Sequence, residues 1–223
     1  MSYTIIENFL PVAVQNMIEE HFIYNSNWSY SSSTSGNSEN FIDKQNENIK
    51  ECSQLINLSY MYRHKYEGTI QNEFRNPETF DLTKIILHFL ELASGCTVTK
   101  LFKIKTKMNL MDKSFEGKFH PPHTDHTLQG VFSLIYYIKD SDGPTRFFNK
   151  SDTDPMPWKD LVEIGQVEPK KGRAVLFPSN IMHTGTCPVE HDNRLSINYV
   201  FEADDLKINF QHQNNLLVEH IHA

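Results

Sequence analysis

By their types and spacing, His123, Asp125 and His183 could together bind a metal ion. Two imidazoles and one carboxylate form a facial ligand set that holds a first-row transition metal, typically Fe(II), and leaves other positions on it open. His123 and Asp125 are two residues apart, so on an extended segment both side chains leave the same face. The pattern His-x-Asp is weak evidence alone, because about 0.6 such matches are expected by chance in a chain of this composition. The sequence therefore predicts a metal site, but the evidence for it has to come from other residues as well.

Two further histidines, His120 and His126, compete with His123 for the ligand position. Neither has an acidic residue two positions later, so we expect both to lie at the rim of the site or on the surface. Pro121-Pro122 fixes the backbone directly before His123 and stiffens the approach to it. His183 lies 60 residues after His123. Tertiary structure therefore has to bring the third ligand to the other two.

An arginine follows the last candidate ligand, because Arg194 stands eleven positions after His183. In the segment 194–201, alternation places Arg194, Ser196 and Asn198 on one face and apolar residues on the other. A guanidinium and a hydroxyl on one strand face can bind a carboxylate, and Arg can do so with two parallel hydrogen bonds. The same pattern is also typical of a sheet whose polar face meets solvent. The strand alone leaves both interpretations open.

The wider pattern predicts a mainly β fold with flanking helices, in the α+β class. Helical spacing covers residues 11–23 and 82–93, with Gly95 where a C-terminal cap belongs. Residues 25–50 are rich in Ser and Asn and predict an exposed loop that could cover a site. Alternating apolar residues bounded by turn residues predict strands at 97–110, 130–139, 145–149, 172–178 and 193–202. Short strands without intervening helices favour a jelly roll.

No linker or internal repeat divides the chain, so we expect one domain over residues 1–223. Residues 1–96 would supply helical support and substrate loops, 97–203 the β core, and 204–223 a C-terminal tail. The formal charge of −7 disfavours nucleic-acid binding, which needs a surface rich in Lys and Arg. One dense run of cations has the spacing of a solvent-facing strand side: Lys100, Lys103, Lys105, Lys107 and Lys113.

Three cysteines without a Cys-x-x-Cys pattern, and no recognisable signal peptide, predict reduced thiols and a cytoplasmic location. No apolar stretch is long enough to cross a membrane. The sequence does not indicate an oligomeric state.

Taken together, these residues resemble the 2-oxoglutarate- and Fe(II)-dependent dioxygenases, whose fold is a double-stranded β-helix, a cupin-like jelly roll. The matching pattern is His123/Asp125, then His183, then Arg194/Ser196. The segment 134–138, Leu-Ile-Tyr-Tyr-Ile, and Gly143 with Phe147 are similar to the prolyl-4-hydroxylase-like branch, in which the second Tyr, here Tyr137, contacts the co-substrate.

That resemblance implies Fe²⁺ as the metal, 2-oxoglutarate as the co-substrate on Arg194, Ser196 and Tyr137, and ascorbate as a further candidate cofactor. It implies hydroxylation of a small molecule or of a peptide or protein, with a prolyl residue as one candidate. No catalytic side chain beyond the metal ligands is then required.

Several departures from the family pattern affect the expectation. Pro144 replaces the second Gly of the branch's Gly-Gly-x-x-x-Phe pattern, and Arg194 stands where the collagen-type members have Lys. The branch often has a Tyr on the strand before its first His, where this chain has Asn109-Leu110-Met111. Nucleic-acid demethylases of the superfamily carry a second Arg six residues after the first, and Val200 stands there instead. Two alternatives stay open: a non-catalytic metal-binding jelly-roll module, and a zinc hydrolase, for which Glu116 would be the nearest candidate base.

Overall fold

The computed structural model describes residues 2–34, 47–64, 70–151, 161–206 and 218–222. The helices are α1 (Val12–Glu20), the π-helical turn η1 (His21–Asn25), α2 (Pro77–Thr83), α3 (Ile85–Ser94) and the 3-10 turn η3 (Lys113–Phe115). The first six strands are β1 (Ser2–Ile6), β2 (Ser29–Ser31), β3 (Gln54–His64), β4 (Ile70–Phe74), β5 (Thr97–Leu110) and β6 (Val131–Tyr137). The other six are β7 (Thr145–Ser151), β8 (Glu163–Val167), β9 (Ala174–Pro178), β10 (Ile181–Thr184), β11 (Asn193–Asp204) and β12 (Val218–His222).

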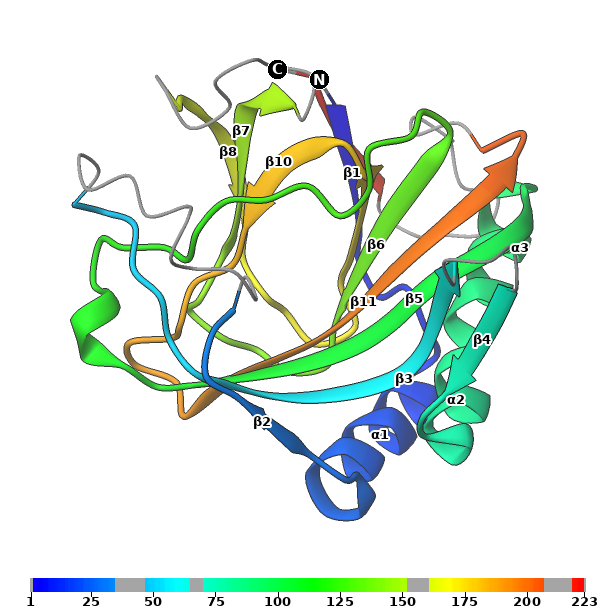
Figure 1. Cartoon of the computed structure of the whole chain (residues 1–223), viewed down its shortest axis with the longest axis horizontal. Coiled ribbons are helices and arrows are strands. Elements are labelled where there is room, and N and C mark those ends of the chain that lie inside the picture. Colours follow the sequence, from blue (N-terminus) through cyan, green and yellow to red (C-terminus); the bar gives the residue numbers. More distant parts are fainter. Residues whose placement is uncertain (1, 35–46, 65–69, 152–160, 207–217, 223) are drawn as a thin grey trace.

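Two antiparallel sheets face one another across the middle of the molecule (Figure 1). Within the described residues, the larger sheet has nine strands in the order β12-β1-β9-β6-β11-β5-β3-β2, with β4 also paired to β3. The smaller sheet has the order β10-β7-β8. The helices pack on the outer face of the larger sheet (Figure 1). This arrangement is the mainly β jelly roll with flanking helices that the sequence predicts.

The hydrophobic residues divide into two main clusters, one on each face of the large sheet. The outer cluster joins the helices to the sheet, through residues such as Ile18, Ile86 and Leu90 from helices and Leu195, Ile197 and Tyr199 from β11. The inner cluster lies between the sheets and includes Tyr137, Phe147 and Phe177. Burying one such side chain fully stabilises the fold by about 1.5–3 kcal/mol. Because the apolar side of β11 faces the helices, its polar side faces the space between the sheets.

The five predicted strands are all present, with ends within two residues of the expected positions. The prediction missed seven strands, namely β1, β2, β3, β4, β8, β10 and β12. All of them except β3 have five residues or fewer, and periodicity cannot distinguish a strand of that length from a loop. Residues 25–50 were therefore wrongly expected to be loop throughout, since they contain β2; positions 35–46 of that segment lie outside the described residues.

The predicted helix over 82–93 is wrong in its extent, because the chain forms two helices that meet at Lys84. Pro77 starts α2, where its missing N–H is not needed. Thr83 Oγ1 donates to the carbonyl of Thr79 at 2.7 Å, a back-bond that bends helices. Gly95 ends α3 with a φ of 73°, and its N–H donates to Glu91 O at 2.8 Å, which confirms the predicted cap.

The segment predicted as a tail contributes β12, which pairs with β1 so that Tyr3 lies opposite Ile221. The two ends of the described chain are therefore side by side (Figure 1). None of the helices in the described ranges is long and apolar enough to cross a membrane.

Candidate metal and co-substrate site

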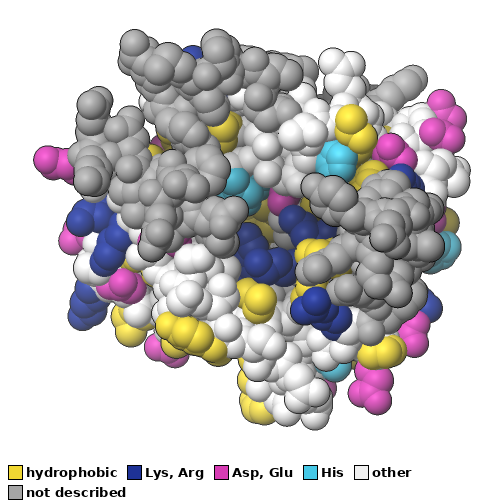
Figure 2. Space-filling view, in the orientation of Figure 1, with side chains coloured by type: hydrophobic (Ala, Val, Ile, Leu, Met, Phe, Trp, Pro, Cys, Tyr) yellow, Lys and Arg dark blue, Asp and Glu magenta, His cyan; other side chains and the backbone are white. Residues whose placement is uncertain are grey.

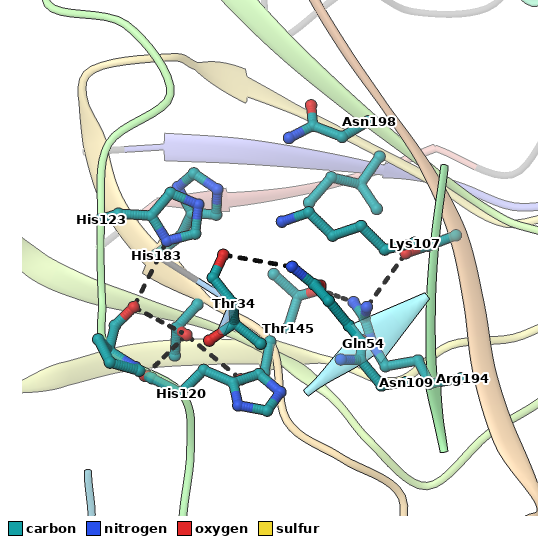
Figure 3. A pocket seen from close by; sticks show the side chains of 15 residues that line it. Thr34, Gln54, Lys107, Asn109, His120, His123, Thr145, His183, Arg194 and Asn198 are labelled. Atoms are coloured by element: carbon teal, nitrogen blue, oxygen red, sulfur yellow. Dashed lines mark hydrogen bonds between the residues drawn. The ribbon is translucent and has the colours of Figure 1, made fainter. Parts of the chain in front are cut away.

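The fold brings His123, Asp125 and His183 together, as the sequence predicts. The backbones of His123 and His183 exchange two hydrogen bonds of 2.9 Å, and their rings lie 4.7 Å apart between centroids. His183 Nε2 lies 3.5 Å from Asp125 Oδ2, and one ligand atom from each residue lies within 4.8 Å of the others. Donors about 2.1 Å from a shared metal are separated by about 3–3.5 Å, so this cluster can close on an ion with small side-chain movements. Figure 3 shows the two histidines on one side of the cavity.

The surroundings of the three residues direct their donor atoms inward. His183 Nδ1 lies 2.9 Å from the carbonyl of Ile181, so a proton on Nδ1 leaves the Nε2 lone pair free toward Asp125. Ser133 Oγ donates to Asp125 Oδ2 at 2.8 Å, and Asn198 Nδ2 donates to both carboxylate oxygens at 2.9 and 3.0 Å. These bonds fix the carboxylate in one orientation, which is how protein metal sites hold their ligands.

Charges around the cluster keep it in the metal-binding protonation state. Burial opposes ionisation of Asp125, but Lys103 and the two histidines hold its pKa well below the ordinary value. Burial, together with the neighbouring His183 and Lys107, holds the pKa of His123 well below its ordinary value. Near neutral pH the cluster thus offers a carboxylate and at least one neutral imidazole, the forms that bind a metal.

Arg194 stands in the same cavity with its guanidinium almost fully buried. Its Nε donates to Gly143 O at 2.7 Å, Nη1 to Ser196 Oγ at 3.1 Å and Nη2 to Thr145 Oγ1 at 2.8 Å. No described carboxylate forms an ion pair with it, although a buried charge without a counter-ion is costly. The predicted Arg194 and Ser196 pair therefore faces the cavity rather than solvent, where a guanidinium and a hydroxyl could bind a carboxylate.

Tyr137 takes a position behind this pair. Its side chain is fully buried, its hydroxyl donates to Thr145 Oγ1 at 2.7 Å, and the Arg194 guanidinium carbon lies 5.6 Å from its ring centre. Thr145, not Tyr137, is among the residues that line the cavity. No sequence pattern indicates the role of Thr145, which stands directly before Arg146 and Phe147.

The lysine side of β5 was predicted to face solvent, and this prediction is wrong. Lys107 lines the cavity and lies opposite Ser196 in the β5–β11 register, Lys105 lies opposite Asn198, and Lys103 donates to Asp125 Oδ1 at 2.8 Å. Directly opposed residues of an antiparallel pair share a face, so this face of β5 is the inner wall of the barrel. Asn109, where the resembling branch often has Tyr, continues the row opposite Arg194.

His120 is also wrongly predicted, since it is buried and not at the rim. Its ring lies beside two thiols, with Nε2 at 3.8 Å from both Cys52 Sγ and Cys187 Sγ. His126 is half-buried, with its ring against Phe102 at 4.7 Å. Glu116, the candidate base for a hydrolase, is exposed and is not among the described residues that line the cavity.

The geometry defines a jelly-roll protein with a two-His, one-carboxylate cluster beside a buried arginine. Residues 107–202 match the family model of the 2OG-Fe(II) oxygenase superfamily, a range that contains all six predicted site residues. This match over the jelly-roll core supports the 2OG-Fe(II) oxygenase superfamily, a class of Fe(II)- and 2-oxoglutarate-dependent enzymes, as the family of this chain. A comparison with curated protein sequences gives no match.

Solved structures of the superfamily share the fold at low sequence identity. The epimerase SnoN in complex with Fe³⁺, alpha ketoglutarate and nogalamycin RO is 12% identical, with a TM-score of 0.51 over 93% of this chain and 82% of that chain. An oxidoreductase of the 2OG-Fe(II) oxygenase family from Burkholderia pseudomallei is 11% identical, with a TM-score of 0.54 over 86% and 78%. A prolyl hydroxylase from Trichoplax adhaerens, bound to a hypoxia inducible factor peptide, is 13% identical, with a TM-score of 0.52 over 90% and 83%.

Proposed function

We propose that His123, Asp125 and His183 hold Fe(II), and that Arg194 and Ser196 hold the distal carboxylate of 2-oxoglutarate. The reaction would convert 2-oxoglutarate, O₂ and a substrate C–H group into succinate, CO₂ and a C–OH group. The observation that carries this proposal is the buried guanidinium of Arg194, which has no described counter-ion and shares one cavity with the metal cluster.

The side chains would act mainly by positioning. Arg194 would bind the carboxylate, and Thr145, supported by the Tyr137 hydroxyl, would hold the guanidinium in place. This fixes the other end of the co-substrate toward the histidines. When bound, Fe(II) supplies the redox chemistry for oxidising the co-substrate and the substrate. Asp125 stays ionised through its contacts with Lys103, Asn198 and Ser133, so the metal would keep its one anionic protein ligand.

The substrate belongs to the proposal as well. Solved structures with this fold carry a peptide in one case and the small molecule nogalamycin RO in another. A prolyl residue of a peptide or protein and a small organic molecule are therefore the two candidate classes. A purely metal-binding module is less well supported, because it gives no role to a buried anion receptor beside the metal cluster.

Anaerobic titration of the protein with Fe(II) and 2-oxoglutarate tests the assignment. We expect the weak visible charge-transfer band of a metal-bound 2-oxo acid, and its loss in the Asp125→Ala and His183→Ala variants. His126→Ala is the matched control, because this neighbouring histidine is not in the cluster. Arg194→Met should keep Fe(II) binding while weakening 2-oxoglutarate by about 100-fold, the effect of losing about 3 kcal/mol.

Succinate formation provides the second measurement. Turnover of 2-oxoglutarate at the wild-type rate by all three variants, Asp125→Ala, His183→Ala and Arg194→Met, would contradict the proposal. Variants that lose turnover must keep their thermal unfolding transition, which shows that the site and not the fold was removed.

A further inference from the structure

Two lysines on the inner face of β5, one lining the cavity and one beside it, form no ion pair within the described residues. Lys103, Lys105 and Lys107 alternate along the inner face of β5, and only Lys103 is paired, with Asp125. Neither Lys105 nor Lys107 forms an ion pair or hydrogen bond through its ammonium group with any residue that the structure describes. Both are partly buried, so solvent compensates for their charge only in part.

The electrostatics of this row are unfavourable in the empty protein. Burial and the neighbouring Lys103 lower the pKa of Lys105 to about 8, and burial with Lys105 and Lys103 lowers that of Lys107 to about 7. An anion beside these groups would remove the mutual repulsion. Such strongly lowered pKa values gather at binding and catalytic sites.

The two carboxylates of the co-substrate would not neutralise all of this positive charge. Lys107 and Arg194 line the cavity, Lys105 lies opposite the cavity residue Asn198, and Lys103 contacts Asp125. A divalent metal would add two further charges to these four. One carboxylate, Asp125, and the two carboxylates of 2-oxoglutarate stand against them. With every lysine protonated, three positive charges are left over, which favours a third reactant that is an anion.

An apolar wall lies directly beside the lysines. In the β3–β5 register, Ile56 lies opposite Lys107 and Leu58 lies opposite Lys105, so these side chains share the inner face. Ile56 and Leu58 are both partly exposed. Figure 2 shows dark-blue Lys and Arg side chains, with hydrophobic side chains beside them, in the hollow at the centre of this face. The wall thus offers cations and aliphatic surface together.

We propose that the substrate of this oxygenase is an organic acid, whose anionic group binds Lys105 and Lys107 and whose aliphatic part packs on Ile56 and Leu58. This inference rests on the proposed function. It selects a small acid over an internal prolyl residue of a peptide, which carries no charge of its own.

Calorimetric titration of the protein loaded with Mn²⁺ and saturating 2-oxoglutarate tests the acid site without turnover. The probe is octanoate, and octanamide is its uncharged counterpart of equal length. We expect saturable binding of octanoate at least about tenfold tighter than that of octanamide, and loss of this preference in Lys105→Met. Lys170→Met is the matched control, because Lys170 is exposed and outside the cavity.

Equal binding of the two probes, no binding of octanoate, or an unchanged preference in Lys105→Met would overturn the acid site. The Fe(II) and 2-oxoglutarate charge-transfer band separates this result from failure of the proposed function. If the wild-type protein shows the band but no acid preference, the substrate inference alone is wrong. If the band itself is missing, the proposed function fails.

A second cluster of metal-binding side chains adjoins the cavity through His120 and does not involve the lysines. Cys52, His120 and Cys187 offer ligand atoms within 4.8 Å of one another. The two sulfur atoms are 3.0 Å apart, and each is 3.8 Å from His120 Nε2. All three come from segments distant in sequence: the residues before β3, the residues before His123, and the loop after β10.

The donor set suits a thiophilic divalent metal. Two thiolates and one imidazole are a known zinc ligand set, with bonds of about 2.3 Å to sulfur and about 2.0–2.1 Å to nitrogen. A tetrahedral ion would require sulfur–nitrogen separations of about 3.6 Å, close to those present, and a sulfur–sulfur separation of about 3.8 Å, which small rotations of the cysteines can provide.

The cluster also has access to solvent. Cys52 and Cys187 border a second cavity, lined in addition by residues such as Tyr30 and Asp112. An ion could enter from there, and a water could complete its coordination. We infer that Cys52, His120 and Cys187 form a zinc site that ties the start of β3 to the segment carrying the iron ligands.

Cobalt(II) titration of the fully reduced protein under anaerobic conditions tests this second site. Only cysteine ligands give the near-ultraviolet thiolate-to-cobalt charge-transfer band, so cobalt at the His123 cluster does not interfere. We expect the band in wild type and in Cys96→Ser, whose thiol is buried elsewhere, and its loss in Cys52→Ser and Cys187→Ser. Zinc should displace the cobalt and raise the melting temperature of the wild type, with a smaller rise in the two cysteine variants.

The zinc site would be overturned by the absence of the band in protein with three titratable thiols. It would also be overturned by a band of equal strength in Cys52→Ser and Cys187→Ser. A count of one thiol under these reducing conditions would assign the pair to a disulfide and reject the metal site.

Discussion

Lys103 donates from Nζ to Oδ1 of Asp125 at 2.8 Å, so the carboxylate of the proposed metal site is already paired with a cation. Asp125 is almost completely buried, and a lone buried carboxylate would take up a proton far more readily than one in water. The lysine keeps Asp125 ionised before any metal arrives. It also reduces the net negative charge that the metal meets.

Replacing Lys103 with Met should make metal binding more sensitive to acid. Without the cation, burial dominates and the pKa of Asp125 rises, so protons compete with the metal at higher pH. We expect the pH at which Mn²⁺ affinity is half lost to move up by about one unit. Calorimetric titrations across pH 4–8 (roughly the range of Asp and His titration) measure this midpoint. An unchanged midpoint in Lys103→Met, with Lys170→Met as the control, would contradict the role given to Lys103.

The hydroxyl of Ser133 should be needed to orient the same carboxylate. Ser133 Oγ donates to Asp125 Oδ2 at 2.8 Å and lies at the same distance from Ser179 Oγ. Ser133→Ala removes the direct bond, and we expect Mn²⁺ affinity to fall by about tenfold. Ser179→Ala removes only the supporting hydroxyl and should have a smaller effect. Equal losses in the two variants, measured by the same titration, would mean that the carboxylate is positioned in another way.

The residues of the proposed metal and anion site could be singled out from the sequence, because their patterns are local or have a fixed spacing. Alternation in β11 placed Arg194 and Ser196 on one face, and the structure places that face in the cavity. The same reasoning failed for Lys105 and Lys107. A period of two shows which residues share a face, but it does not show which face lies inside a barrel. Here the opposite face of β5 is covered by helices, so neither side of the strand is the solvent side.

The burial of His120 could not be predicted for a different reason. Its neighbours Cys52 and Cys187 lie 68 and 67 residues away in sequence, so no local pattern connects the three. The short strand β10, which carries His183, also gives little periodic signal of its own. Its place follows from pairing with β7, a contact that only the assembled fold defines.

Gly143 should be required for the position of Arg194. A Cβ at residue 143 would lie 2.6 Å from the backbone oxygen of Thr186 and 3.1 Å from Arg194 Cδ. The backbone contact cannot be relieved by a side-chain rotation, so Gly143→Ala should displace the segment whose carbonyl accepts from Arg194 Nε. We expect 2-oxoglutarate affinity to fall by about tenfold or more, with Mn²⁺ affinity nearly unchanged. Parallel loss of both affinities would instead indicate a collapse of the whole site.

Lys107 should lower the stability of the metal-free protein at neutral and acidic pH. Its pKa is about 7 in the folded chain, against about 10.4 in an unfolded chain, because burial and the neighbouring lysines disfavour its charge. Between these two values the unfolded state binds the additional proton, so stability rises with pH across this window. Below pH 7 the full penalty is present, and above about 10.4 it vanishes.

Lys107→Met removes the charge and keeps an unbranched side chain, so it should stabilise the metal-free protein below pH 7. We expect a gain on the order of 1 kcal/mol, or roughly 2–4 °C in melting temperature, and we expect that gain to shrink steadily from pH 7 to pH 10 (roughly the folded-to-unfolded window of the lysine). Urea unfolding at several pH values measures the trend, with Lys170→Met expected to show none. A variant that is less stable than wild type at low pH would show that Lys107 has a compensating partner in the folded chain. That result would also count against the proposal that Lys107 binds an anionic substrate, because the stability prediction and the binding proposal both depend on an unpaired charge at Lys107.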